Sequence, residues 1–256
     1  PALLNLYRHF HAHPELSGQE AHTARRVAEE LSAAGCKVTT GIGGHGVVGV
    51  LENGPGPILM LRADMDALPI QEETGLPYAS RETAIGPQGQ STPVMHACGH
   101  DLHITNLVGT ARVVSSFRDM WNGSLLMVAQ PAEEAIGGAR LMLQDGFFSR
   151  FPRPSCALAL HVDPQLPAGT ISIGPGYVTT SCQSLDVIIK GRSGHGAAPH
   201  LGTDPIVLAA QFIMALQTIV SRRTDPRETA VMHVGRVEGG TSRNTIAEKV
   251  VLELSI

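Results

Sequence analysis

The densest group of side chains that could do chemistry lies between Met95 and His103, where the sequence is Met-His-Ala-Cys-Gly-His-Asp-Leu-His. Thiolate, imidazole and carboxylate groups are all ligands of first-row metal ions. A cysteine close to a glycine-flanked histidine allows both side chains to face one ion. The alternative is a buried cysteine beside polar groups that cap a helix. Spacing alone does not choose the ligands among the candidates, which are His96, Cys98, His100, Asp101 and His103.

Two adjacent glutamates, Glu133 and Glu134, are the second candidate for catalysis. One carboxylate can bind a metal ion while its neighbour takes a proton from a water that the ion activates. Such a base works best when its pKa lies near the operating pH, and a metal ion lowers the pKa of its water towards roughly 7. Adjacent glutamates also occur in solvated turns, so the pair gains meaning only from its position.

That position follows from the predicted strands. Three apolar stretches, 58–61, 124–129 and 157–160, indicate buried strands. Ligands bind outside the carboxyl ends of the strands in open α/β sheets. Helices over 20–34 and 104–117 complete an α/β pattern for about the first 175 residues. The groups that follow the three strands are Asp64 and Asp66, then the glutamate pair, then His161 and Asp163.

A second, smaller domain is predicted after Gly174-Pro175-Gly176. A strand over 184–190, a helix that begins near Pro205 and runs to about 220, and strands near 230–237 and 250–254 give an α+β order. We therefore expect a catalytic domain over residues 1–178 and a lid or dimerisation domain over residues 179–256. No apolar run approaches the roughly 18 residues that a membrane span needs.

Composition narrows the functional class. The chain has 256 residues and a net charge of −4, with no cluster of lysines or arginines, which argues against nucleic-acid binding because that depends on neutralising phosphates. Its four cysteines are far apart in sequence and no signal-peptide pattern opens the chain. A reduced, cytoplasmic protein with no membrane or nucleic-acid partner is the expectation.

Several motifs occur in an order that resembles one known family. They are His11-Ala12-His13-Pro14-Glu15-Leu16-Ser17, Arg62-Ala63-Asp64-Met65-Asp66-Ala67-Leu68-Pro69, Met95 to His103, Gln130-Pro131-Ala132-Glu133-Glu134, His161-Val162, Gly194-His195-Gly196-Ala197-Ala198-Pro199-His200, and Gly239-Gly240-Thr241-Ser242-Arg243-Asn244. The chain is similar, nearly end to end, to the hippurate hydrolase and N-acyl-amino-acid amidohydrolase branch of the dinuclear-metal aminoacylases and carboxypeptidases. The resemblance implies an aminopeptidase-like α/β domain with a mixed sheet between helices. It also implies an inserted ferredoxin-like α+β lid that forms a homodimer.

The resemblance also implies the site and its reaction. Two divalent metal ions, manganese or zinc with cobalt or nickel also compatible, would hydrolyse the amide bond of a small N-acyl amino acid such as hippurate. Glu133 would be the general base, and Asp66 would support the site from behind the ligands. His96, Asp101 and His103 would be structural or supporting. The implied ligands are Cys98, which would bridge the ions, with His100, Glu134 and His161.

Two residues of the second domain gain a role from the same resemblance. His195 would donate to the oxyanion in the partner subunit's site, and Asn244 would lie near the substrate's carboxylate. The family continues past the lid into a segment that carries a further ligand histidine, so the chain is expected to be C-terminally truncated. Two alternatives stay open: an inactive binding or assembly module with a partial metal cleft, and a hydrolase that uses Cys98 as its nucleophile.

Overall fold

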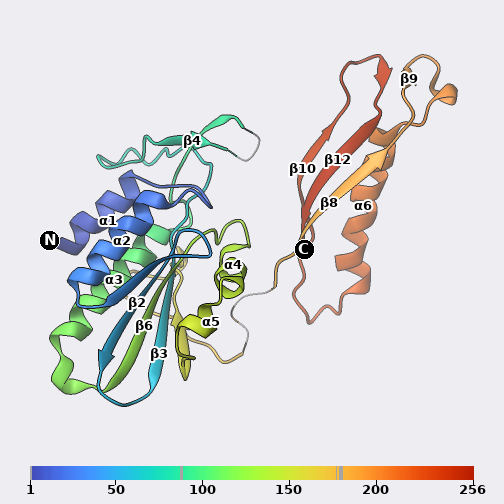
Figure 1. The fold of residues 1–256 in the computed structure, drawn as a ribbon. Helices are drawn as coiled ribbons and strands as arrows, with labels where there is room; N and C mark the ends of the chain where they lie inside the picture. Colours follow the sequence, from blue (N-terminus) through green and yellow to red (C-terminus); the bar gives the residue numbers. More distant parts are fainter. Residues whose placement is uncertain (1, 87–88, 177, 179–180) are drawn as a thin grey trace. The chain divides into compact units, whose positions relative to one another are not determined.

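The computed structural model describes residues 2–86, 89–176, 178 and 181–256 (Figure 1). The chain separates into two compact units, Pro1–Ile171 and Ser172–Ile256. The predicted domain boundary, between residues 178 and 179, falls next to residue 179, which lies outside the described residues. The division of the structure therefore comes shortly before the predicted one.

A five-stranded sheet forms the middle of the first unit (Figure 1). β1, β2 and β6 pair antiparallel, whereas β6, β3 and β7 are parallel, so the predicted mixed sheet is confirmed. β6 is apolar and buried along nearly its whole length, as expected of a central strand that is covered on both faces. In sheet order the strands are β1 (Lys37–Ile42), β2 (Gly46–Asn53), β6 (Gly123–Gln130), β3 (Ile58–Asp64) and β7 (Cys156–Ala159).

Helices pack on both faces of this sheet. Met127 of β6 joins a core with α1, α2 and α3, whereas its neighbour Leu126 joins a second core with α4 and α5. Successive side chains of a strand point to opposite faces, which places the two sets of helices on opposite sides. The helices are α1 (Ala2–Ala12), α2 (Ala21–Ala33), α3 (His100–Ser116), η1 (Arg118–Met120), α4 (Gly138–Gln144) and α5 (Phe147–Arg150); a small hairpin joins β4 (Thr83–Ile85) to β5 (Ser91–Pro93).

The helix predicted over 104–117 begins earlier, at His100, and this prediction was wrong at its start. Gly99 precedes the helix with a φ of 81°, in the left-handed region that glycine enters without steric cost. A Cβ added to Gly99 would lie 2.5 Å from Cγ2 of Val162. The motif from Met95 to His103 therefore contains a helix start, and the chain after β7 packs directly against it.

The second unit has the predicted order of strand, helix, strand and strand. Its three-stranded antiparallel sheet has the order β10-β12-β8, and α6 packs on one face, where Ala209 contacts a core that includes Val250 and Leu252. Asp204 caps α6 by accepting a hydrogen bond from the Ile206 amide (2.9 Å). The elements are β8 (Ser184–Lys190), β9 (Gly194–His195), η2 (Pro199–Leu201), α6 (Pro205–Arg223), β10 (His233–Gly239), β11 (Thr245–Ile246) and β12 (Lys249–Ser255).

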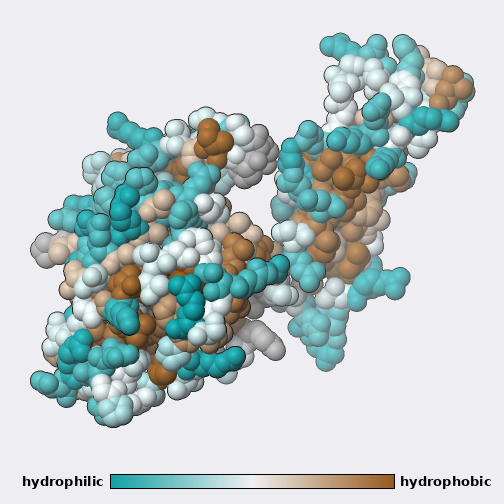
Figure 2. All heavy atoms as spheres, viewed as in Figure 1, coloured by the Kyte–Doolittle hydropathy of each residue, from teal (hydrophilic) through white to brown (hydrophobic). Residues whose placement is uncertain are grey.

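Helix α6 is long and apolar enough to cross a membrane by length and composition, and among the described residues it is the one helix that is. No uninterrupted apolar run of that length occurs in α6, because Gln211 and Gln217 interrupt it, but the mean hydropathy over the helix is still high. Only 11% of this apolar window is buried, and the buried residues of α6 are Pro205 and Ala209. Apolar side chains also gather on the visible face of the second unit (Figure 2).

Candidate metal centre

The four predicted ligands meet where β3, β6 and β7 end. Sγ of Cys98 lies 3.4 Å from Nε2 of His161. Nε2 of His100 lies 3.8 Å from Oε1 of Glu134 and 4.0 Å from Oε2 of Glu133. Ligand atoms of Cys98, His100 and His161 all lie within 4.8 Å of one another, and so do those of His100 and the two glutamates. The chain therefore brings these predicted residues to one place.

Two buried atoms of this cluster have no hydrogen-bond partner among the described residues: Nε2 of His100 and Oε1 of Glu134. Buried polar atoms are nearly always paired, because an unpaired one costs free energy. Zinc binds imidazole nitrogen at about 2.0–2.1 Å and carboxylate oxygen at about 2.0–2.2 Å. Two donors separated by 3.8 Å can therefore share one ion. The residues present fit a divalent cation.

Backbone carbonyls set the tautomers of His100 and His161, the two histidines predicted to bind metal. Nδ1 of His100 donates to the carbonyl oxygen of Asp66 (2.9 Å), and Nδ1 of His161 donates to that of Val162 (2.7 Å). In a neutral imidazole, a donating Nδ1 leaves Nε2 as the lone-pair nitrogen. Metal-binding histidines usually donate their second ring nitrogen in this way. Both Nε2 atoms are thus prepared to bind the same metal centre.

Asp66 contacts two of the predicted ligands, His100 and Glu134. Its Oδ1 is 3.3 Å from Nδ1 of His100, and its Oδ2 accepts hydrogen bonds from the amide of Glu134 (2.9 Å) and the hydroxyl of Ser17 (2.6 Å). Its side chain is fully buried. This arrangement suits the supporting role that the sequence predicted.

Asp64 and His103 form a buried pair; the sequence analysis gave His103 a structural or supporting role but did not predict its partner. Nδ1 of His103 donates to Oδ1 of Asp64 (2.5 Å), while Nε2 of His103 accepts from the amide of Val162 (3.0 Å). Arg62 donates to the other carboxylate oxygen of Asp64 (2.6 Å). Oδ1 of Asp64 also lies 3.7 Å from Nε2 of His100. The available signal was the position of Asp64 at the end of a buried strand.

The remaining candidates of the helix-start motif lie apart from this pair. Asp101 accepts from Nδ1 of His11 (2.7 Å), whose Nε2 contacts Glu72 (3.0 Å). Both ring nitrogens of His96 are buried without a hydrogen-bond partner among the described residues, and burial lowers the pKa of His96 to about 4. Neither His96 nor Asp101 belongs to a described group that could hold a metal ion.

The comparisons with known proteins decide the family. Residues 60–253 match the model of peptidase family M20/M25/M40. This chain belongs to that family. It is 38% identical to N-acetyl-L-cysteine deacetylase of Bacillus subtilis, covering 98% of this chain and 58% of the relative. It is 39% identical to hippurate hydrolase of Campylobacter jejuni, covering 100% of this chain and 66% of the relative.

A solved structure of the same family has a similar fold to this M20-family chain. The dinuclear metal binding peptidase of the M20 family from Bacillus subtilis superposes with a TM-score of 0.72 at 34% identity, covering 99% of this chain and 63% of that chain. The resemblance found in the sequence is confirmed. The chain spans about three fifths of the length of these relatives.

The electrostatics of the M20-family site favour a cation. Burial, reinforced by the charge of Glu134, raises the pKa of Cys98 to about 12. Burial also raises the pKa of Glu134. Burial lowers the pKa of His100, but its bond to Asp66 and the nearby carboxylates outweigh this and leave it raised. Divalent cations reverse such shifts and deprotonate a coordinating thiol.

The two glutamates differ in exposure. The side chain of Glu133 is 41% exposed and that of Glu134 is 20% exposed. Their turn is bounded by two residues with positive φ, Ala132 (47°) and Ile136 (53°), which is uncommon for residues other than glycine. The turn aims both carboxylates at His100, and it leaves Glu133 the more accessible of the two.

The two predicted site residues of the second unit are neighbours there. β9 pairs with β11, which places His195 opposite Thr245, and the carbonyl oxygen of Asn244 accepts from the amide of Gly196 (2.8 Å). Nδ1 of His195 accepts from the amide of Ala197 (3.1 Å). In the neutral ring Nε2 then carries the proton, so it can donate a hydrogen bond.

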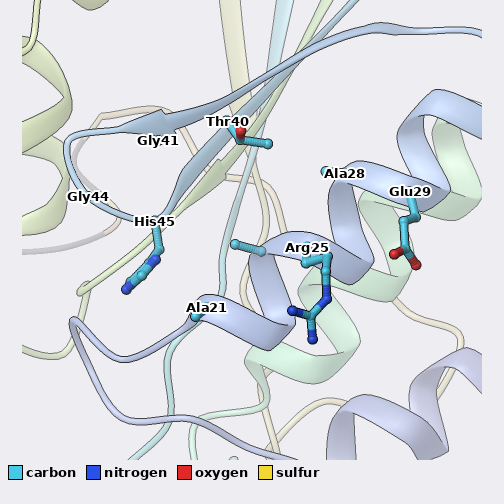
Figure 3. Close-up of a pocket in the computed structure, with 9 residues that line it drawn as sticks. Ala21, Arg25, Ala28, Glu29, Thr40, Gly41, Gly44 and His45 are labelled. Carbon is cyan, nitrogen blue, oxygen red and sulfur yellow. The ribbon is translucent and has the colours of Figure 1, made fainter.

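The hollow drawn in Figure 3 is separate from the metal cluster. It has a volume of about 410 Å³ and lies between α2 and the β1–β2 turn. None of the predicted site residues lines it, and the charged side chains of Arg25 and Glu29 and the ring of His45 do not converge on one point. No chemistry follows from this arrangement.

Proposed function

We propose that the protein hydrolyses the amide bond of N-acyl amino acids, with hippurate-like substrates, and releases a carboxylic acid and an amino acid. The observation that carries this proposal is the convergence of Cys98, His100, Glu134 and His161, with the buried Nε2 of His100 and Oε1 of Glu134 unpartnered. The relatives' names, hippurate hydrolase and N-acetyl-L-cysteine deacetylase, support the substrate class.

In this proposal the four converging residues hold two divalent ions, manganese or zinc, with cobalt or nickel as further candidates. Bound ions would polarise the amide carbonyl and increase the acidity of water. Cys98 has a soft sulfur ligand and lies within 3.4 Å of His161, which supports its role as the bridge between the two ions. Asp66 keeps His100 and Glu134 in place through its bonds to both.

Glu133 is the proposed general base. It takes a proton from the attacking water and returns that proton to the leaving amine. Its carboxylate lies 4.0 Å from His100, at the edge of the cluster, and it is more exposed than that of Glu134. A base that meets water and substrate needs this access, whereas a ligand does not.

The second unit supplies the remaining groups. His195 is proposed to donate through Nε2 to the oxyanion in the partner subunit's site, and its ring has the tautomer that this requires. Asn244, which the β9–β11 pairing and its bond to the Gly196 amide bring close to His195, is proposed to bind the substrate's carboxylate. A homodimer through this unit is supported by exposed apolar side chains on α6, such as Ile206 and Met214.

The test is a panel of N-acyl amino acids, hippurate included, with the metal content of the same sample measured. We expect release of free amino acid that a chelator abolishes and that added manganese or zinc restores. Binding without release would instead favour the inactive module. Inactivation by thiol alkylation that metal neither prevents nor requires would favour Cys98 as a nucleophile. The raised pKa of Cys98, which results from burial and the neighbouring carboxylates, argues against that role.

A further inference from the structure

The turn that carries Glu133 and Glu134 rests on a carboxylate from a distant part of the chain. Glu20 is completely buried, at the residue before α2, and its Oε1 accepts hydrogen bonds from the amides of Ala132 (2.7 Å) and Gly18 (2.9 Å). Glu20 and Ala132 are 112 positions apart in sequence. Neither the proposed metal ligands nor the proposed base includes Glu20, so its burial has no other explanation within the site.

We propose that Glu20 is a positioning residue that fixes the backbone at Ala132 and thereby sets the direction of the Glu133 and Glu134 carboxylates. Ala132 has a φ of 47°, a conformation that residues other than glycine hold only when their surroundings enforce it. The bond from its amide to Glu20 is one such constraint. The carbonyl oxygen of Ala132 accepts from the amide of Gly138 (3.0 Å), which closes the turn.

The same N-terminal segment supports the turn at a second point. Ser17 donates to Oδ2 of Asp66 (2.6 Å), and the same Oδ2 accepts the amide of Glu134 (2.9 Å). Glu20 therefore holds the amide of Ala132, before Glu133. Ser17, through Asp66, supports the amide of Glu134, after Glu133. A shift of either amide would move the base and the ligand together, because they are adjacent residues of one short turn.

A matched control lies within the same segment. Glu15 also accepts two backbone amides, those of His22 (3.1 Å) and Thr23 (2.7 Å), but both belong to the start of α2 and neither belongs to the turn. Glu15→Met and Glu20→Met each remove a carboxylate that accepts two amide hydrogen bonds. They differ in whether one of those amides belongs to the turn at 131–138. Glu20→Gln keeps a side-chain oxygen that can accept from Ala132.

The first measurement is hydrogen–deuterium exchange of peptides that cover residues 131–138, in the 256-residue chain with manganese and without it. Glu20→Met should speed exchange in this turn about tenfold, as loss of one hydrogen bond allows, whereas Glu15→Met should affect only the start of α2. Glu20→Gln should stay close to the wild type. Equal exchange in Glu20→Met and the wild type would overturn the proposal. If Glu20→Met does not fold, Glu20→Asp, whose carboxylate is one methylene shorter, replaces it with the same expected result.

The second measurement is turnover of hippurate, and this consequence rests on the proposed function. Glu20→Met should lower kcat by about 10²-fold, as small misplacements of catalytic groups do, with KM changed far less and with recovery in Glu20→Gln. Equal loss of kcat in Glu15→Met and Glu20→Met would show a general effect on folding and would overturn the positioning role. If the wild type hydrolyses no N-acyl amino acid, the proposed function fails, while the exchange measurement still decides the role of Glu20.

Discussion

The two units hold their candidate residues in different ways. In the first unit, Asp64, Asp66 and His100 are buried, and each is fixed by hydrogen bonds to other side chains or to the backbone. In the second unit, His195 and Asn244 are exposed, and short backbone pairing between β9 and β11 sets their positions. Changes to the first network should therefore alter stability as well as chemistry. Changes in the second unit should alter the rate alone.

Replacing the proposed base, Glu133, should have the largest effect on the rate. It should lower turnover without changing how the first unit binds metal. Glu133→Gln should lower kcat roughly 10²–10⁴-fold, the range that general bases contribute. Manganese affinity measured by calorimetry should stay the same, because Glu133 is the more exposed carboxylate and is not a proposed ligand. A variant that keeps wild-type turnover of hippurate would show that Glu133 is not the base.

Removing the buried Asp64 should reduce the stability of the first unit. Asp64→Ala leaves His103 and Arg62 without their partner, and breaking such a buried pair costs roughly 3–5 kcal/mol. Urea unfolding followed by fluorescence of Trp121, the single tryptophan, reports on this unit. Asp145→Asn, which breaks an exposed pair with Arg150, should change stability by less than about 1 kcal/mol.

The effect of Asp64 should also depend on pH. Burial raises the pKa of Asp64, but its bond to His103 and the charge of Arg62 outweigh this and lower it to about 2 from an ordinary value of 3.8. A carboxyl with a depressed pKa in the folded state stabilises fully above its unfolded pKa and loses that contribution as pH falls through the folded value. The stability difference between Asp64→Ala and the wild type should therefore be largest above pH 3.8 and shrink towards pH 2. A stability difference that stays constant from pH 3.8 to pH 2 would show that the ionised Asp64 carboxylate does not stabilise the fold through His103 and Arg62.

Removing His195, the proposed oxyanion donor, should affect only the rate. His195→Ala should lower kcat about 10²–10³-fold, as loss of an oxyanion donor does, and should leave the unfolding of the first unit unchanged. His200→Ala, in the exposed η2 that closely follows β9, is the matched control and should retain full activity. Mixing His195→Ala with Glu133→Gln subunits should restore part of the activity if His195 acts in its partner's site. Lack of recovery in a mixed dimer would rule out that arrangement.

The sequence was sufficient where a residue's position in one element determines its place. Glu134 and His161 follow strands of the sheet, so strand direction alone predicts that they meet at one edge of the sheet, whereas only the resemblance placed Cys98 there. The start of α3 was misplaced because the left-handed Gly99 begins the helix directly at the ligand motif. The resemblance supplied the choice of ligands, which spacing had left open.

The contacts that support the site could not be predicted from the sequence, for a different reason. His103 meets Asp64 across 39 positions and Glu20 meets Ala132 across 112, and no spacing within one element encodes such pairs. They depend on how α2, α3 and the strand ends pack together. A pattern can therefore show which side chains could bind a metal ion, whereas only the packed chain shows which other side chains hold them in place.

The smallest predicted effect is the pH dependence of metal binding. Because burial and the charge of Glu134 raise the pKa of Cys98 to about 12, its thiol is protonated at neutral pH without metal. Binding as a thiolate must release that proton. Manganese affinity should therefore rise at least tenfold for each pH unit between pH 6.5 and 8.5, because Cys98 releases one proton and His100, whose pKa is also raised, adds to the slope at the lower end. Cys98→Ser should lose much of this slope, whereas His195→Ala, in the other unit, should keep it. A wild-type affinity independent of pH would show that Cys98 does not bind as a thiolate.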